Sequence, residues 1–207
     1  NIGRLTLYKA GVLYDAGIFT ESEIETTKAL HLLTNSGQDR LIYEGYNLMA
    51  LNSKELNQKE DALKYFKLAL NRLDKLEKDN YPKNKILKSR ASIYNNMGRM
   101  YEKINNYKEA TNLYRKGLES QNIKQNTPIL YAMLINNLAH AQMKTGNDYE
   151  TEKLFKEALK IRDSLQIESG IVASKINIGE YYLYKKDTQR LYVNRGFGFI
   201  GYPGRVG

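Results

Sequence analysis

A small residue recurs about every 40 positions along this chain, and that recurrence limits the folds open to it. The residues are Ala10, Ala50, Gly98, Ala139 and Gly179, separated by 40, 48, 41 and 40 positions. Each lies in an apolar stripe spaced as on one face of an α-helix, and a second such stripe follows each of the first four. A period of this length predicts helical pairs that stack, because one pair cannot bury its apolar face alone.

Three units show the pattern most clearly. They read Tyr94-x2-Met97-Gly98-x2-Tyr101, Tyr107, Ala110-x3-Tyr114, Leu118; then Ile135-x2-Leu138-Ala139, Gly146, Thr151-x3-Phe155, Ala158-Leu159; and, earlier, Tyr46, Met49-Ala50, Ala62-x3-Phe66, Ala69-Leu70. These residues resemble the tetratricopeptide repeat (TPR), whose pattern is W-x2-L-G-x2-Y followed by A-x3-F. Over about residues 1–187 the chain is similar to the long-period arrays of bacterial signalling proteins. The resemblance implies an all-α fold, a right-handed superhelical solenoid of antiparallel helix pairs.

Two features depart from the TPR pattern. The consensus Trp is replaced by Tyr46, Tyr94, Ile135 and Lys175. The period is near 40 rather than 34, which predicts helices lengthened by about a turn at the junctions 78–82 and 121–128. Pro82 and Pro128 suit the entry to the following helix, because a proline there loses no helical hydrogen bond.

The expected helices fall into four pairs and one unpaired helix within a repeat domain of residues 1–187. They span 2–16, 21–34, 39–56, 59–77, 84–104, 107–121, 127–145, 148–165 and 168–186. Residues 188–207 break the pattern. Five glycines lie among the last twelve residues, alternating with aromatic and β-branched ones, which favours an extended or β-like tail over a helix.

Two further resemblances concern this tail. Residues 195–202, RGFGFIGY, fit the RNP1 octamer of RNA-recognition motifs, in which aromatic side chains stack on bases. Residues 191–207 are similar to a C-terminal segment of metallophosphoesterases, but the Asp, His and Asn metal ligands of that family have no counterpart here, so no phosphatase activity is expected. The tail is also expected to contact either its own groove or a neighbouring chain.

The composition narrows the function classes. The chain has no Cys and two histidines, His31 and His140, which leaves little material for a thiolate zinc site, a cysteine nucleophile or a Ser-His-Asp triad. We therefore expect no catalytic residues, no metal and no cofactor. No apolar run is long enough for a membrane span, and no signal peptide is visible at the first residue. Cytoplasmic and periplasmic locations both remain open.

An asparagine recurs two positions before the small residue in three consecutive units. These residues are Asn96, Asn137 and Asn177. In TPR arrays the first helix of each pair lines the concave face, and an amide there can pair with the N–H and C=O of an extended peptide. The alternative is that these side chains are solvated or bond between helices. The first two units carry Tyr8 and Leu48 instead, so the asparagine ladder would span only the C-terminal half.

Charged residues lie one turn further along the same stripe. Arg99, Lys103, His140 and Lys144 form a candidate basic patch, with Tyr184 at the matching place in the last unit. Such a patch would favour an acidic peptide or a C-terminal carboxylate. Asp15, Glu44 and Glu55 precede it, so the groove would run from acidic to basic and orient a bound segment. Ordinary solubilising charge is the alternative.

The sequence thus predicts a non-catalytic scaffold that binds a protein or peptide, as a fragment of a bacterial sensor or regulator. The alternative function is a nucleic-acid-binding helical repeat protein that uses its net charge of +9 and the RNP1-like tail. Steep salt dependence of RNA binding would distinguish the two.

Overall fold

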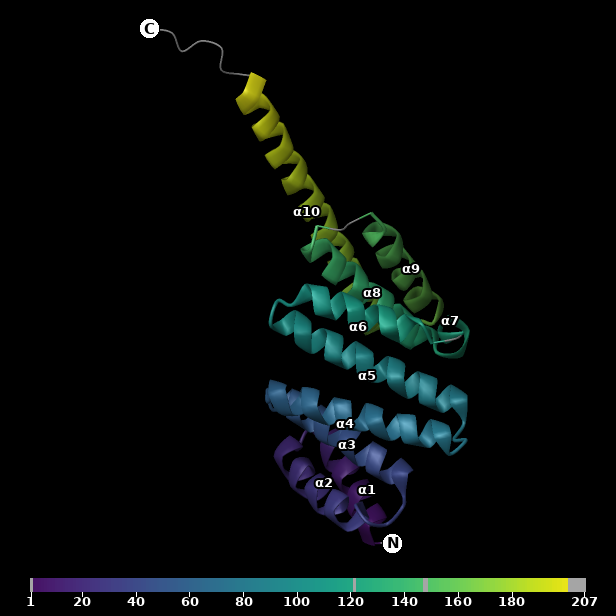
Figure 1. The fold of residues 1–207 in the computed structure, drawn as a ribbon. Coiled ribbons are helices and arrows are strands. Elements are labelled where there is room, and N and C mark those ends of the chain that lie inside the picture. Colours follow the sequence, from purple (N-terminus) through teal and green to yellow (C-terminus); the bar gives the residue numbers. More distant parts are fainter. Residues whose placement is uncertain (1, 121, 147–148, 201–207) are drawn as a thin grey trace.

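Helices form all the regular secondary structure in the residues that the computed structural model describes, which are 2–120, 122–146 and 149–200, with side chains described through residue 188 (Figure 1). The helices are α1 (Ile2–Asp15), α2 (Phe19–Leu33), α3 (Asp39–Glu55), α4 (Lys59–Lys78), α5 (Lys83–Lys103), α6 (Tyr107–Leu118), α7 (Ile123–Asn126), α8 (Pro128–Lys144), α9 (Thr151–Ser164) and α10 (Glu168–Ile200).

Consecutive helices form antiparallel pairs that stack along one axis. The pairs are α1 with α2, α3 with α4, α5 with α6, and α8 with α9, and α10 follows as the first helix of a fifth unit (Figure 1). The expected solenoid of helix pairs is confirmed. The N-terminus lies at one end of the stack and α10 extends beyond the other end.

The turn inside each pair has the same geometry. A residue with positive φ stands seven positions after each small residue: Gly17, Asn57, Asn105 and Gly146. Glycine and asparagine adopt this left-handed conformation most readily, and it ends a helix while satisfying its last carbonyls. The backbone N–H of Gln58, for example, donates to the carbonyl of Ser53 at 2.8 Å. The sequence therefore fixes where the first helix of each pair stops.

The small residues allow the two helices of a pair to approach closely. Ala10, Ala50 and Ala139 are fully buried. A Cβ added to Gly98 would overlap the ring of Tyr114, so only glycine fits at that position. Tyr114 is itself fully buried, as are Phe66 and Phe155 in the second helices of neighbouring pairs. Small residues on first helices and large ones on second helices thus build the core.

The longer period has two structural origins. At the first junction α4 has 20 residues and α5 has 21, as the expectation of lengthened helices requires. At the second junction the extra residues form the separate four-residue helix α7 rather than lengthening their neighbours.

The C-terminal segment differs from the expectation. Helix α10 continues to Ile200, so residues 188–200 are helical rather than extended, and the expected boundary after residue 187 falls inside this helix. A helix satisfies its backbone groups within its own segment, so Gly196 and Gly198 each lower its stability by about 1 kcal/mol but do not forbid it. Residues 195–200 of the RNP1-like octamer are therefore not on a strand. The rest of the expected tail, residues 201–207, lies outside the described residues.

Two features are absent from the described ranges. None of these helices combines the length and apolar character that crossing a bilayer requires. No group of three or more His, Asp or Glu side chains there is arranged to hold a metal ion.

Candidate functional site

The first helices of successive pairs line one face of the solenoid. Direct contacts join α1 to α3, α5 to α8, and α8 to α10, whereas α3 and α5 are joined mainly through α4, which packs against both. Elements on the inside of a curved stack lie closer together than those outside it, so this face is the concave one. We call it the concave face. Its two halves, α1–α3 and α5–α10, differ in chemistry.

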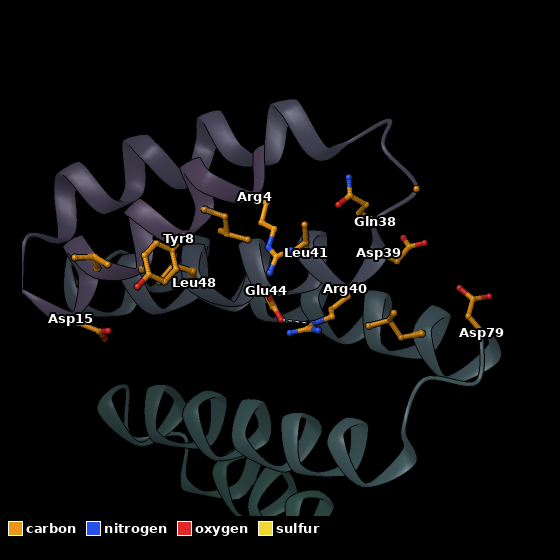
Figure 2. Close-up of a pocket in the computed structure, with 15 residues that line it drawn as sticks. Arg4, Tyr8, Asp15, Gln38, Asp39, Arg40, Leu41, Glu44, Leu48 and Asp79 are labelled. Carbon is orange, nitrogen blue, oxygen red and sulfur yellow. Dashed lines mark hydrogen bonds and ion pairs between the residues drawn. The ribbon is translucent and has the colours of Figure 1, made fainter. Parts of the chain in front are cut away.

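The N-terminal half contains a groove of about 830 Å³ between α1 and α3 (Figure 2). Its apolar lining includes Leu7, Tyr8, Val12, Leu41, Leu48 and Leu76. The side chain of Tyr8 is 74% exposed and that of Val12 is 53% exposed, so apolar surface here is open to solvent. The groove could receive a large apolar side chain of a bound segment.

Ion pairs hold one end of this groove. Asp39, at the start of α3, is buried and contacts Arg72 and Lys75 of α4, each at 2.7 Å. The hydrogen bond from Lys75, opposed by burial and reinforced by Arg72, holds the pKa of the Asp39 carboxyl below its ordinary value. Arg40 pairs with Glu44 at 2.9 Å within α3. These contacts fix two of the carboxylates that line the groove, those of Asp39 and Glu44.

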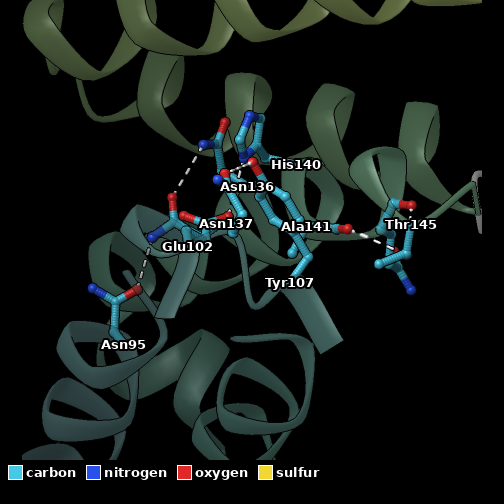
Figure 3. A network of polar contacts seen from close by, with 10 residues as sticks. Asn95, Glu102, Tyr107, Asn136, Asn137, His140, Ala141 and Thr145 are labelled. Carbon is cyan, nitrogen blue, oxygen red and sulfur yellow. Dashed lines mark hydrogen bonds and ion pairs between the residues drawn. The ribbon is translucent and has the colours of Figure 1, made fainter. Parts of the chain in front are cut away.

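The C-terminal half is built around a chain of amides (Figure 3). Asn137 Nδ2 of α8 donates to Asn95 Oδ1 of α5 at 2.9 Å. Asn136 Nδ2 in turn donates to Asn137 Oδ1 at 3.5 Å. Asn95 and Asn136 are buried, 2% and 4% exposed. The first bond joins α8 to α5 and the second lies within α8, so the two bonds satisfy polar groups that are buried where these helices meet.

A buried arginine continues the chain toward α10. Arg162 of α9 is 7% exposed, and its Nη1 donates to Ser174 Oγ at 2.7 Å, to the Gly170 carbonyl at 3.1 Å and to Asn136 Oδ1 at 3.4 Å. No carboxylate among the described residues pairs with it. Burial lowers its pKa. Polar contacts therefore join the fourth pair to α10.

A histidine and a glutamate bridge the third and fourth pairs. His140 Nδ1 lies 3.0 Å from Glu102 Oε1, and its ring meets that of Tyr107 edge-on with centroids 6.3 Å apart (Figure 3). The same carboxylate acts on Tyr114: burial and then the charge of Glu102 raise the pKa of the Tyr114 hydroxyl. Because Glu102 contacts His140, the candidate basic patch contains a negative charge.

The predicted site residues all lie on first helices, α5, α8 and α10, but differ in availability. Asn96 and Asn177 are half-buried, with no side-chain partner among the described residues, whereas Asn137 is engaged with both neighbours. Arg99, Lys103 and Lys144 are exposed, and none has an ion-pair partner in the described part of the chain. Tyr184 is half-buried and packs beside Phe155 and Tyr181.

Three features of the structure were not predicted from the sequence. Glu102 was not recognised as the partner of His140, since the contact joins different helices. Arg162 was missed, although the matching positions of α2 and α4 hold Leu33 and Leu73 and the departure from that pattern is visible in the sequence. The groove beside Tyr8 was also missed, because its lining combines residues of α1, α3 and the end of α4, which no local pattern brings together.

Residues 90–122, which span most of α5 and all of α6, match the family model of the tetratricopeptide repeat. The crystal structure of BtubC (BKLC) from P. vanneervenii is similar to the chain with a TM-score of 0.70 and 20% identity, covering 96% of this chain and 82% of that one. The fold is a tetratricopeptide-repeat solenoid.

A second similar structure has TPR-like repeats throughout. It holds the nearly identical TPR-like repeats of a Podosopora anserina protein assigned as a kinesin light chain, with a TM-score of 0.66 and 16% identity, covering 90% of this chain and 88% of that one. No curated protein sequence gives a significant match. The TPR solenoid is thus recognised by its geometry across its length and by sequence at its third pair.

Proposed function

We propose that this TPR solenoid is a non-catalytic scaffold, part of a bacterial sensor or regulator, that binds one extended protein segment along its concave face. TPR repeats generally mediate interactions between proteins. The observation that carries the proposal is that Asn96 and Asn177 have no side-chain partner among the described residues. They stand at the same position of their units as Asn137 does in the unit between them.

Amides at this spacing suit the backbone of an extended chain. Each offers two N–H donors and a carbonyl acceptor, so it can pair with a peptide N–H and C=O without reading the side chain between them. Asn137 already donates once and accepts once, which leaves it one N–H and one lone pair. The three residues can therefore act together.

The neighbouring charges favour an acidic stretch on this half of the face. Arg99, Lys103 and Lys144 are exposed cations. Arg99 lies about one helical turn after Asn96, and Lys103 and Lys144 lie about two turns after Asn96 and Asn137. Glu102 offsets part of this charge where it contacts His140. Acidic side chains of a bound segment would meet the remaining cations at the rim.

The test is selection of phage-displayed random peptides of about 12 residues, which span roughly 40 Å when extended. Affinities of the enriched peptides are then measured for the wild-type chain and for the triple variant Asn96→Ala, Asn137→Ala, Asn177→Ala. Losing three amide contacts should weaken binding roughly ten- to hundred-fold. Circular dichroism checks that helicity is retained.

A matched variant on the outer surface controls for general effects. Lys67, Lys153 and Lys160 are exposed on second helices, and their joint replacement by Ala should leave affinity unchanged. Equal affinity of the asparagine triple variant would contradict the ladder. If no peptide is enriched, the proposal of an extended bound segment is wrong.

A further inference from the structure

The rim of the concave face changes sign halfway along the solenoid. Five positions after each small residue stand Asp15, Glu55, Lys103 and Lys144, one at the C-terminal end of each first helix. All four side chains are exposed. The first two pairs therefore present carboxylates where the next two present ammonium groups.

The carboxylates of Asp15 and Glu55 both influence Tyr14. Tyr14 lies at the end of α1, and its pKa is raised by burial, then by the charge of Glu55, then by that of Asp15. Both charges thus act on Tyr14, the neighbour of Asp15, and Asp15 itself lines the groove. Glu55 also contacts its neighbour Lys54 at 2.9 Å. The edge of the groove at Asp15 is a local region of negative potential.

The groove beside this acidic edge is apolar, through Tyr8 and Val12 of α1 and Leu48 of α3. Two arginines also line it, but neither lies at the rim. Arg40 is paired with Glu44, and Arg4 lies eleven residues before Asp15, about 16 Å away along the helix. The N-terminal half thus combines an apolar floor with an acidic rim.

We infer that the bound segment carries its charges in a fixed order. Lysine or arginine and large apolar side chains lie against α1 and α3, and aspartate or glutamate lies against α5 and α8. The inference rests on the proposed binding of an extended segment and adds its chemistry and its orientation. A segment bound the other way round would place like charges opposite each other at both ends, which weakens binding.

The test compares peptides selected on two proteins with the same net charge. One is the wild-type chain, and the other is the rim-exchanged variant Asp15→Lys, Glu55→Lys, Lys103→Glu, Lys144→Glu. Peptides selected on the wild type should carry a basic, apolar block and an acidic block in one order. The variant should bind those peptides roughly ten- to hundred-fold more weakly and should select the reverse order.

The control exchanges one exposed charge of each pair on the second helices. In Glu21→Lys, Glu60→Lys, Lys108→Glu, Lys153→Glu the order of the selected blocks should stay as in the wild type. Enriched peptides without a common charge order, or an order unchanged by the rim exchange, overturn the inference and leave the proposed function standing. Absence of enriched peptides contradicts both.

Discussion

The first two pairs and the following units use one repeat geometry but are held together differently. Between the first pair and the second, the contacts are apolar apart from one short buried chain, in which Asn52 of α3 donates to Ser22 Oγ of α2 at 2.9 Å and Ser22 donates to the Ala10 carbonyl of α1 at 2.8 Å. Between α5, α8 and α10 an amide chain from Asn95 leads to the buried Arg162. In the second region, polar groups on the concave face therefore have a structural role as well as a proposed binding role.

The largest expected effect compares matching aromatic residues in the two regions. Phe66 of α4 and Phe155 of α9 are both fully buried, four positions after Ala62 and Thr151 respectively. Replacing either by Ala should lower the free energy of unfolding by roughly 3–5 kcal/mol, through lost burial and a residual cavity. Urea unfolding measures this loss. A much smaller loss in one variant would show that its pair collapses around the cavity, so that the two regions do not share one core geometry.

The next largest effect concerns the contribution of Arg162 to stability. Its aliphatic stem fills a position held by Leu33 and Leu73 in α2 and α4, while its charge has no carboxylate partner among the described residues. Arg162→Ala should destabilise the chain by roughly 2–3 kcal/mol, whereas Arg162→Leu should stay within about 1 kcal/mol of the wild type. Thermal unfolding decides between them. If Arg162→Leu lowers the stability as much as Arg162→Ala does, the contribution of Arg162 comes from its hydrogen bonds to α10 and not from the packing of its stem.

A smaller effect on stability distinguishes Asn137, which bonds to another helix, from Asn96 and Asn177. Asn137→Ala removes the donor to the buried Asn95 and should cost about 1 kcal/mol. Asn96→Ala and Asn177→Ala remove no side-chain bond and should change stability by less than about 0.5 kcal/mol. Differential scanning calorimetry of the three single variants checks the difference. Equal losses would mean that the three asparagines are equivalent in the fold.

The smallest effect is a pH dependence specific to the first region. The pKa of Asp39 is lowered on folding, so its contribution is present above the unfolded value of about 3.9 and is lost as pH falls through the lower folded value. Asp39→Asn should therefore cost about 0.5–1 kcal/mol at pH 7 and progressively less below pH 4. Chemical unfolding at several pH values measures it. A loss that is independent of pH would assign the effect to packing rather than to charge.

Sequence reasoning predicted the repeat well because its determinants are local. The spacing of Ala10, Ala50 and Gly98 sets the close approach of helices, and the residues that end the first helices, such as Asn57, follow at a constant distance. The contact of Glu102 with His140 joins side chains 38 positions apart, and no local pattern indicates it. Residues 188–200 were expected to be extended because glycine disfavours helices, yet they are helical. The helix propensity of single residues is a weak preference, so it does not decide the structure of such a segment.

The central claim is that a bound segment lies along the concave face, and site-specific photo-crosslinking tests it most directly. p-Benzoylphenylalanine is placed in separate variants at Tyr8 and Arg99 on first helices and at Lys67 and Lys153 on second helices. All four residues are exposed, so the probe should not disturb the core. With a peptide enriched on the wild-type chain, crosslinks should form at Tyr8 and Arg99 only. Equal crosslinking at Lys67 and Lys153 would contradict binding on the concave face.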